Sequence, residues 1–457
     1  MNTRIYTLVS IIIASLLLMW YALYNGFPLV TGDTGAYIYF TFDFQVLKDR
    51  SSFYSIWLAL AGLRTLQFVG ITGSLWLPVF FQCILVAVLF LRYYRMLGND
   101  AVVKTSGYLL AIVLVAIATG VSFIVAYIMP DMFVAILLLA ILLYLYDNEP
   151  STKLSLLYLG LIGFSMLVHY SHFLIVPVFC ILMLLYAQVT NQLSVKARLG
   201  KVLSISAVCW VLMCSINAVY GLGFTLSPGS HVFMAGKLIE TGTIKKYLDE
   251  QCAEKHYKLC TYKNELPERA YQCIWDDNGA FKHIGGWDSS AAEHKAIIRD
   301  VFTTPRYAIH FAGQALKDTW EQLQFMYVEG NGQAFNETSA PYMSIEKHIK
   351  AELPQFVKSR QQKQTIDNST WANIQLVLLI FSSLWVLLLL FKGSLQKHIT
   401  HVYMAILLFV ACNAFVTASF ANVLDRLQIR VFWVLPATNI FVLVNYYWAK
   451  CKYSLLS

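Results

Sequence analysis

The sequence predicts an all-α polytopic membrane protein, with about ten transmembrane helices and a mainly helical external domain between spans seven and eight. Of its 457 residues, 58% are hydrophobic and 15% aromatic, only 13% carry a charge, and the mean hydropathy is +0.58. Soluble proteins average about 25% charged residues, so this chain lacks the polar side chains that would cover a water-soluble globule. The composition excludes cytosolic enzymes, disordered tails and fibrous repeats.

Ten apolar stretches are the basis of the predicted span count. A bilayer core of about 30 Å requires roughly 20 helical residues, so each stretch was judged in a window of about that length. The stretches cover residues 5–24, 75–91, 107–127, 131–146, 154–168, 173–189, 202–222, 373–391, 402–420 and 431–449. We therefore expect spans one to seven within residues 1–222 and spans eight to ten within residues 372–457.

Three hydrophilic stretches separate these spans, and all of them lie outside if the N-terminus is cytoplasmic. They are a first external loop at 25–74, an external domain at 223–371 and a last turn at 421–430. The internal loops contain Arg92, Arg95, Lys104, Lys153, Lys196, Arg198, Lys201, Lys392, Lys397, Lys450 and Lys452, whereas the short external ones contain Lys48, Arg50, Arg64, Arg426 and Arg430. The positive-inside rule therefore predicts cytoplasmic N- and C-termini. The membrane that we expect is a plasma membrane, the inner membrane of a bacterium.

The external domain is large enough, at roughly 150 residues, to have its own core. Helical periodicity appears at Thr243–Glu254, Ala291–Asp300 and Pro305–Tyr327. Three of the nine cysteines of the chain, Cys252, Cys260 and Cys273, lie in this region. An oxidising compartment favours one disulfide, which we expect between Cys260 and either of the other two. Zinc is the alternative, but no Cys-x-x-Cys spacing supports it.

Ionisable side chains next to the external membrane surface are the candidate site. Asp33 follows the first span between Gly32 and Gly35, and Asp131 opens the fourth span after Pro130. Either acid could instead cap the helix that it precedes. The other candidates are His169 and His172 at an external hairpin, and Arg426 and Arg430 in the last external turn. Packing against neighbours is the alternative for the histidines, and extension of the side chain to the interface is the alternative for the arginines.

These features resemble the GT-C class of membrane glycosyltransferases, which use polyprenyl-phosphate sugars as donors. In that class an acid lies in the first external loop and an arginine lies late in the chain, near the donor phosphate. The resemblance implies that Asp33 is the catalytic acid and that Arg426 and Arg430 bind phosphate. It also implies membrane-lying helices in Phe53–Val69.

The resemblance carries further expectations about chemistry and partners. Asp33 would remove a proton from the acceptor, while Asp131, His169 or His172 would contact or orient substrate. The donor would be a polyprenyl-phosphate-linked sugar, and the acceptor a glycan, lipid or protein at the external membrane face. The sequence has no acid-x-acid pair at Asp33, so a divalent metal is an open possibility and no metal ligand is assigned. The net charge of +8 is spread along the chain, and nucleic acid is not an expected partner.

Other functions are compatible with parts of the pattern. A transporter or flippase of a lipid-linked sugar or other anionic lipid would use the same arginines and histidines. Such a protein should have polar or broken helices at the bilayer midplane and often a repeated half, and the sequence shows neither. A structural membrane subunit is a third possibility. Asp33-Thr34-Gly35 matches the aspartic-protease triplet, but no second triplet occurs.

The charge bias of the loops predicts the side of the membrane on which each loop lies. A reporter that is active only in the cytoplasm should be active when fused after Lys397, and a reporter active only outside should be silent there. The matched fusion within 421–430 should give the opposite pair of results. An external reporter that is active at Lys397 would contradict the proposed orientation.

Overall fold

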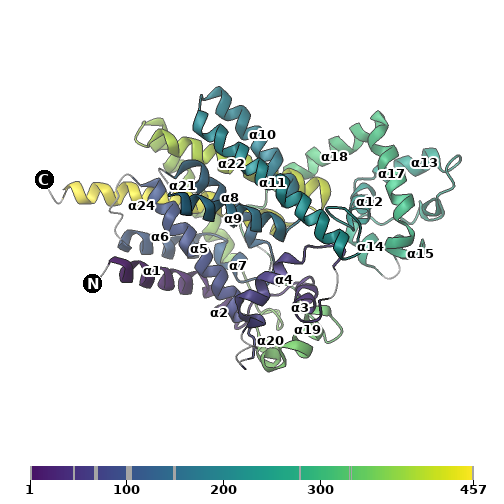
Figure 1. Cartoon of the computed structure of the whole chain (residues 1–457), viewed down its shortest axis with the longest axis horizontal. Coiled ribbons are helices and arrows are strands. Elements are labelled where there is room, and N and C mark those ends of the chain that lie inside the picture. Colours follow the sequence, from purple (N-terminus) through teal and green to yellow (C-terminus); the bar gives the residue numbers. More distant parts are fainter. Residues whose placement is uncertain are drawn as a thin grey trace.

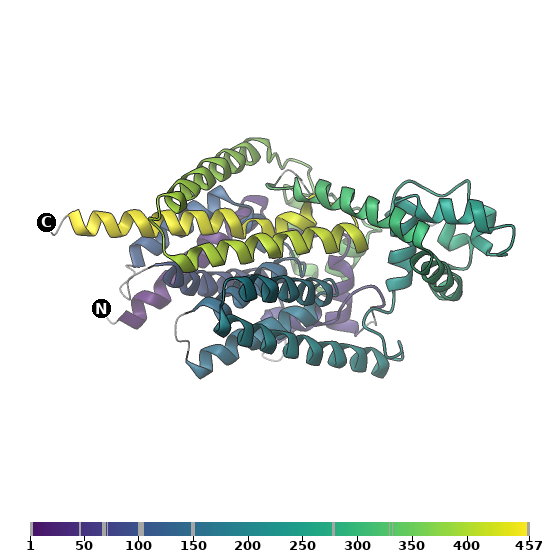
Figure 2. The same cartoon turned by 90° about the horizontal axis from the view of Figure 1, so that it is seen from above.

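The computed structural model describes residues 3–44, 47–65, 70, 72–98, 105–147, 151–276, 279–328, 330 and 332–454. Within these ranges every regular element is a helix, and the strand-like pairing is confined to an isolated bridge between Leu29 and Tyr127. Figures 1 and 2 show a long helical bundle, with the start of the first helix and the end of the last on one side. A smaller helical domain projects from the opposite side, which we call the domain end of the bundle.

Each predicted span coincides with one helix or with two consecutive helices. They are α1 (Thr3–Leu18) with α2 (Trp20–Asn25), α5 (Trp76–Leu97), α6 (Thr105–Ala118) with α7 (Val121–Val125), α8 (Met132–Tyr146), α9 (Thr152–Val168), α10 (His172–Val189), α11 (Leu193–Val219), α21 (Ser369–Phe391), α22 (Lys397–Phe420), and α23 (Asp425–Phe432) with α24 (Val434–Ser454). Six of these segments are long and apolar enough to cross a membrane, namely α5, α10, α11, α21, α22 and the α23–α24 pair. They are the helices of an integral membrane protein, and the count of ten remains a prediction.

The helix α8 occupies the centre of the bundle. Every one of its residues from Met132 to Tyr146 is buried, because its sequence is apolar on all sides and has no polar face to turn outward. Its neighbours include α5, α9, α11, α22 and α23. Asp131 immediately precedes α8, so the central position of this helix brings an acid to the middle of the domain end.

The first predicted external loop folds over the domain end of the bundle. It contains α3 (Thr34–Asp43), α4 (Phe53–Leu58) and a π-helical segment, η1 (Ala59–Leu63). The helices expected at Phe53–Val69 are present from Phe53, and the chain kinks at Ala61 and Gly62, whose dihedral angles are not helical. Residues 66–69 lie outside the described ranges. A later segment covers this loop with α19 (Ala340–His348), η4 (Lys350–Glu352) and α20 (Leu353–Lys358). α19 approaches α3 so closely that a Cβ on Gly35 would lie 2.4 Å from the main-chain carbon of Ala340.

The smaller domain has a hydrophobic core of its own, built from residues 232–315. Its elements are α12 (Ser230–Glu240), α13 (Thr243–Gln251), η3 (Lys258–Tyr262), α14 (Ala270–Trp275), α15 (Ala280–His283), α16 (Gly286–Ser289), α17 (Ala291–Thr303) and α18 (Pro305–Leu323). The three helices expected here are confirmed as α13, α17 and α18. Figure 2 shows α18 running from the bundle into this domain.

The separate domain is smaller than the predicted range of 223–371. Val328, Phe335, Ile345, Ile349, Phe356 and Ile366 belong to the core of the bundle. The segment after α18 is hydrophilic overall, which is why its composition resembles that of a soluble domain. Its few apolar side chains pack against the first loop and the helix ends, so this segment caps the bundle.

The predicted disulfide is present. Cys252, at the end of α13, is bonded to Cys260 in η3, and Cys273 in α14 is a buried free thiol. The two bonded residues are separated by eight positions, so the bond closes a small loop.

Loss of this bond should destabilise the smaller domain by about 2–3 kcal/mol, because a short loop is no longer constrained in the unfolded chain. We expect Cys252→Ser and Cys260→Ser to lower its unfolding midpoint to the same extent. The double variant should be no less stable than either single variant, because the bond can be lost only once. Additive losses, or free thiols at both positions in protein from an oxidising compartment, would contradict the assignment.

Candidate functional site

Main-chain hydrogen bonds fasten the loop after α2 to the segment before α8. The amide of Ile128 donates to the carbonyl of Leu29 at 2.9 Å. Further along, the hydroxyl of Thr34 donates to the carbonyl of Ile128 at 3.1 Å. These bonds hold Asp33, at the start of α3, close to Asp131, at the start of α8.

The carboxylate of Asp33 is in an ion pair and does not cap α3. Its Oδ1 lies 2.9 Å from Nη1 of Arg50, and the same guanidinium donates to the main-chain oxygen of Asp33. Its Oδ2 lies 4.0 Å from Nη2 of Arg426, which is beyond hydrogen-bond distance. The side chain is 42% exposed. The capping interpretation of Asp33 is therefore wrong, and the residue presents an acceptor oxygen at the surface.

The carboxylate of Asp131 is also in ion pairs and does not cap α8. Its Oδ1 accepts a hydrogen bond from Nη1 of Arg430 at 3.1 Å, and its Oδ2 lies 3.3 Å from Nη1 of Arg426. The side chain is only 4% exposed, and a charge so far from water requires a partner of opposite sign. Asp131 thus gathers both arginines of the last turn.

Arg430 points into the bundle and is fully buried. Its Nη2 donates to Oδ1 of Asn413 at 3.1 Å and to Oγ of Ser171 at 3.3 Å. Asn413 in turn donates to the carbonyl of Leu427, which fixes α23 to α22. The interfacial interpretation of Arg430 is wrong, because its charge is turned away from water. Arg430 joins α8, α10, α22 and α23 and does not reach the surface.

Arg426 lies one helical turn before Arg430 and is the accessible arginine of the pair, with its side chain 24% exposed. It stands between the two acids, near Oδ2 of Asp33 and Oδ2 of Asp131. Its Nη1 is buried and lacks a hydrogen-bond partner of good geometry. Nη1 faces Asp131 inside the bundle, so the exposed part of the guanidinium, on the side of Asp33, is the part that an anion can approach.

The two predicted histidines border this cluster with ring centroids 5.3 Å apart. Nδ1 of His169 accepts from the main-chain N–H of Ser171 at 3.2 Å and lies 2.8 Å from its hydroxyl. Burial and the nearby charge of Arg430 lower the pKa of His169, which keeps the ring neutral near pH 7. His172 is fully buried and pairs with the carbonyl of Ser165 at 2.6 Å. His169 thus joins the cluster through Ser171, whereas His172 is a packed interior residue.

The cluster also contains side chains that the sequence pattern did not single out, among them Arg50, which is shared with Asp49, and Ser171 and Asn413. The sequence could have marked Arg50 as a candidate, because arginine is less common in external loops than in cytoplasmic ones. It could have marked Asn413 too, since polar residues within membrane spans are rare and commonly functional. Nothing marked Ser171 beyond its position between the two histidines. Each contact of these residues within the cluster depends on tertiary packing.

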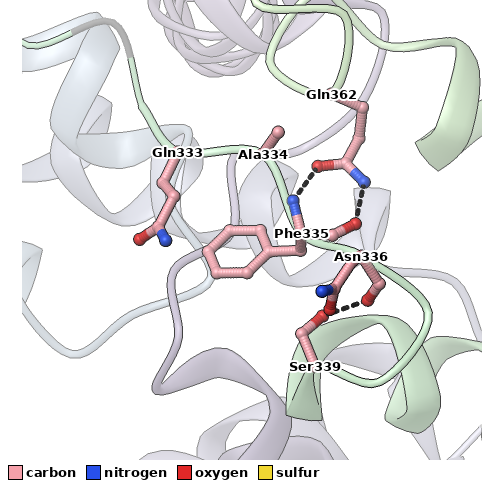
Figure 3. A pocket seen from close by; sticks show the side chains of 6 residues that line it. All are labelled: Gln333, Ala334, Phe335, Asn336, Ser339 and Gln362. Carbon is pink, nitrogen blue, oxygen red and sulfur yellow. Dashed lines mark hydrogen bonds between the residues drawn. The ribbon is translucent and has the colours of Figure 1, made fainter.

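A pocket of about 380 Å³ opens on the segment after α18. Its lining is uncharged and consists of Gln333, Ala334, Phe335, Asn336, Ser339 and Gln362 (Figure 3). The side-chain amide of Gln362 forms two hydrogen bonds of 2.8 Å with the main chain of Phe335, which fix the shape of the loop. Gln333 and Asn336 are exposed, so the pocket offers neutral amides to a ligand.

This pocket adjoins the loop that carries Asp33. The side chain of Gln361 exchanges hydrogen bonds of 3.1 and 2.7 Å with the main chain of Val30. The same amide donates to the carbonyl of Gln333 at 3.0 Å. On the other side of Asp33, Gly35 lies against Ala340, which follows the pocket in sequence. Both flanks of Asp33 are therefore attached to the pocket segment.

The donor set of the cluster does not suit a divalent cation. Asp33 pairs with Arg50, and Asp131 pairs with Arg426 and Arg430. A metal would have to displace guanidinium groups that already neutralise both carboxylates, and the described residues contain no group of three or more metal-binding side chains. We therefore derive no reaction step through a metal.

Removal of the shared carboxylate should destabilise the bundle strongly. Asp131→Asn leaves the buried Arg430 without its anion and removes the nearer of the two acids beside Arg426. Loss of one partner of a buried pair typically costs about 3–5 kcal/mol. Asp131→Asn combined with Arg430→Gln should recover part of this loss, because the deepest unpaired charge is also removed. Thermal unfolding in detergent measures both effects.

Asp43→Asn is the control for this measurement. Asp43 pairs with Lys347 at the surface, where an ion pair contributes about 0–1 kcal/mol. An Asp131→Asn variant as stable as Asp43→Asn would show that the buried pair has no structural role.

In comparisons with known proteins, no protein-family model, no curated protein and no solved structure matches the chain.

Proposed function

We propose that the protein is a membrane glycosyltransferase that moves a sugar from a polyprenyl-phosphate donor to an acceptor at the external membrane face. The observation that carries the proposal is the pairing of an accessible carboxylate with an accessible guanidinium at the domain end. Oδ2 of Asp33 and Nη2 of Arg426 lie 4.0 Å apart, and neither side chain serves as a helix cap or extends away from the bundle. A lipid phosphate would meet Arg426 where the apolar helices end.

The proposed reaction is a displacement at the anomeric carbon of the donor sugar. The acceptor hydroxyl oxygen bonds to this carbon while the bond from the carbon to the phosphate oxygen breaks. The phosphate leaves with that electron pair, and Oδ2 of Asp33 takes the hydroxyl proton. Arg426 stabilises the negative charge that develops on the phosphate through its forked donors.

The other members of the cluster act as positioning residues in this proposal. Arg50 holds Oδ1 of Asp33, which leaves Oδ2 for the proton. Arg430 and Asp131 are buried, so they fix Arg426 and would not touch the donor phosphate directly. This differs from the role that the sequence assigned to Arg430. His169, neutral and bonded to Ser171, is available to orient a hydroxyl group.

The neutral pocket beside Asp33 is the proposed acceptor subsite. Amide side chains donate and accept hydrogen bonds, as sugar hydroxyls do, and the lining carries no charge. Its volume of about 380 Å³ is within the range of small-ligand sites. A glycan is therefore favoured over a lipid or protein as the acceptor.

Asp33→Asn tests the proposed base. An amide cannot accept the hydroxyl proton, so sugar transfer should fall about 10²–10⁴-fold while thermal stability is unchanged. The measurement is the release of polyprenyl phosphate by the protein in nanodiscs, from a panel of polyprenyl-phosphate sugars with extracted envelope glycan as acceptor. Mass spectrometry quantifies the released lipid. Asp43→Asn is the matched control, because this acid lies at the other end of α3 and pairs with Lys347.

The outcomes separate the candidate functions. Equal release by wild type and Asp33→Asn would remove Asp33 from the mechanism. Movement of intact donor across the membrane of proteoliposomes, with no release of polyprenyl phosphate, would support the transporter or flippase instead.

A further inference from the structure

One face of α18 carries large apolar side chains that no other described part of the chain covers. Ile309, Leu316 and Trp320 are 72%, 65% and 69% exposed. Their spacings of seven and four residues place them on one side of the helix. The other side, with Tyr307 and Phe311, is buried in the core of the smaller domain. α18 therefore has two apolar faces, and only one of them is used within the chain.

The last turn of α18 is fixed at the domain end of the bundle. Nε2 of Gln322 donates to the carbonyl of Leu424 at 2.7 Å, and the amide of Leu424 donates to Oε1 of Gln322 at 3.0 Å. Leu424 directly precedes α23, and α18 also packs against α22. Trp320, two residues before Gln322, thus lies level with the start of α23.

This level coincides with the edge of the apolar part of the bundle. α22 has 24 residues, which gives a length of about 36 Å against a hydrocarbon core of about 30 Å. An α22 that crosses this core exceeds it at its ends, and the next apolar segment begins close by, at Asp425. If both segments span the bilayer, Trp320 lies at the level between the hydrocarbon and the head groups, where tryptophan is enriched in membrane proteins.

The neighbourhood of Trp320 favours lipid over a protein partner. Lys317 is exposed and lies one turn from Trp320 on the same helix, so its ammonium group can reach lipid phosphates. α22 packs against α18, and two large apolar side chains of its last turns, Phe415 and Phe420, are 37% and 40% exposed. A tryptophan, a nearby lysine and an apolar surface at this level are the features of a segment that lies at a bilayer surface.

We propose that the outer face of the last two turns of α18, with Leu316 and Trp320, lies in the membrane interface and contacts bilayer lipid. The smaller domain is then held against the membrane by α18 in addition to its chain connections. Because Gln322 is bonded to Leu424, the same contact holds the start of α23, and with it Arg426, at the lipid surface. This inference concerns the membrane contact alone and does not depend on the reaction proposed above.

Fluorescence quenching in nanodiscs tests the contact with the full-length protein. The chain has 11 tryptophans, so the emission of Trp320 is taken as the difference between wild type and Trp320→Phe. We expect lipids brominated in their acyl chains to abolish most of this difference signal, and acrylamide in the water to affect it little. Trp275→Phe is the control, because Trp275 is 54% exposed in α14 of the smaller domain. Its difference signal should show the reverse pattern.

Two results would overturn the proposal. If acrylamide quenches the difference emission of Trp320 and brominated lipid does not, this face of α18 lies in water. A signal that neither quencher reaches would indicate a protein cover, such as a second copy of the chain. If Trp320→Phe is poorly produced, Leu316→Trp in the wild-type background gives a second probe on the same face. Its emission is the difference between the variant and wild type, with the same expected pattern.

Discussion

An arginine fully removed from water at the end of an apolar helical bundle requires a carboxylate within reach, and Asp131 meets this requirement 3.1 Å from Arg430. The pair joins the central helix α8 to α23, and Ser171 and Asn413 extend the bonding to α10 and α22. Four helices therefore share one charged junction inside the bundle. The position of Arg426, one turn away on α23, follows from that junction.

The cluster divides into a buried layer and an accessible layer. Arg430, Asp131 and His172 are closed off from water, and their hydrogen bonds set the geometry of the helix ends. Asp33 and Arg426 lie above them with partly exposed side chains, and Arg50 holds one oxygen of Asp33. A reactive site needs supporting residues of this kind, because the buried layer fixes the positions of the accessible groups that a substrate would touch.

The segment after α18 connects the two parts of the molecule. Its apolar residues complete the core of the bundle, its amides form the neutral pocket, and Gln361 attaches it to the main chain of Val30 beside Asp33. At its start, Gln322 of α18 is bonded to Leu424 before α23. The same part of the chain is thus attached beside Asp33, through Gln361, and beside Arg426, through Gln322.

The sequence by itself indicated the helical membrane architecture and a helical domain between the spans, because hydropathy and charge bias are local properties of the chain. It also selected Asp33, Asp131, His169, Arg426 and Arg430, which the structure brings together, and His172, which is a packed interior residue. The disulfide between Cys252 and Cys260 could also be predicted, because the two cysteines are close in sequence. Only the tertiary structure decided that the acids form ion pairs and do not cap helices, that Arg50 holds Asp33, and that apolar residues such as Val328, Phe356 and Ile366 belong to the core of the bundle. Asp131 and Arg430 are 299 residues apart, and contacts over such separations are set by helix packing, which no local pattern records.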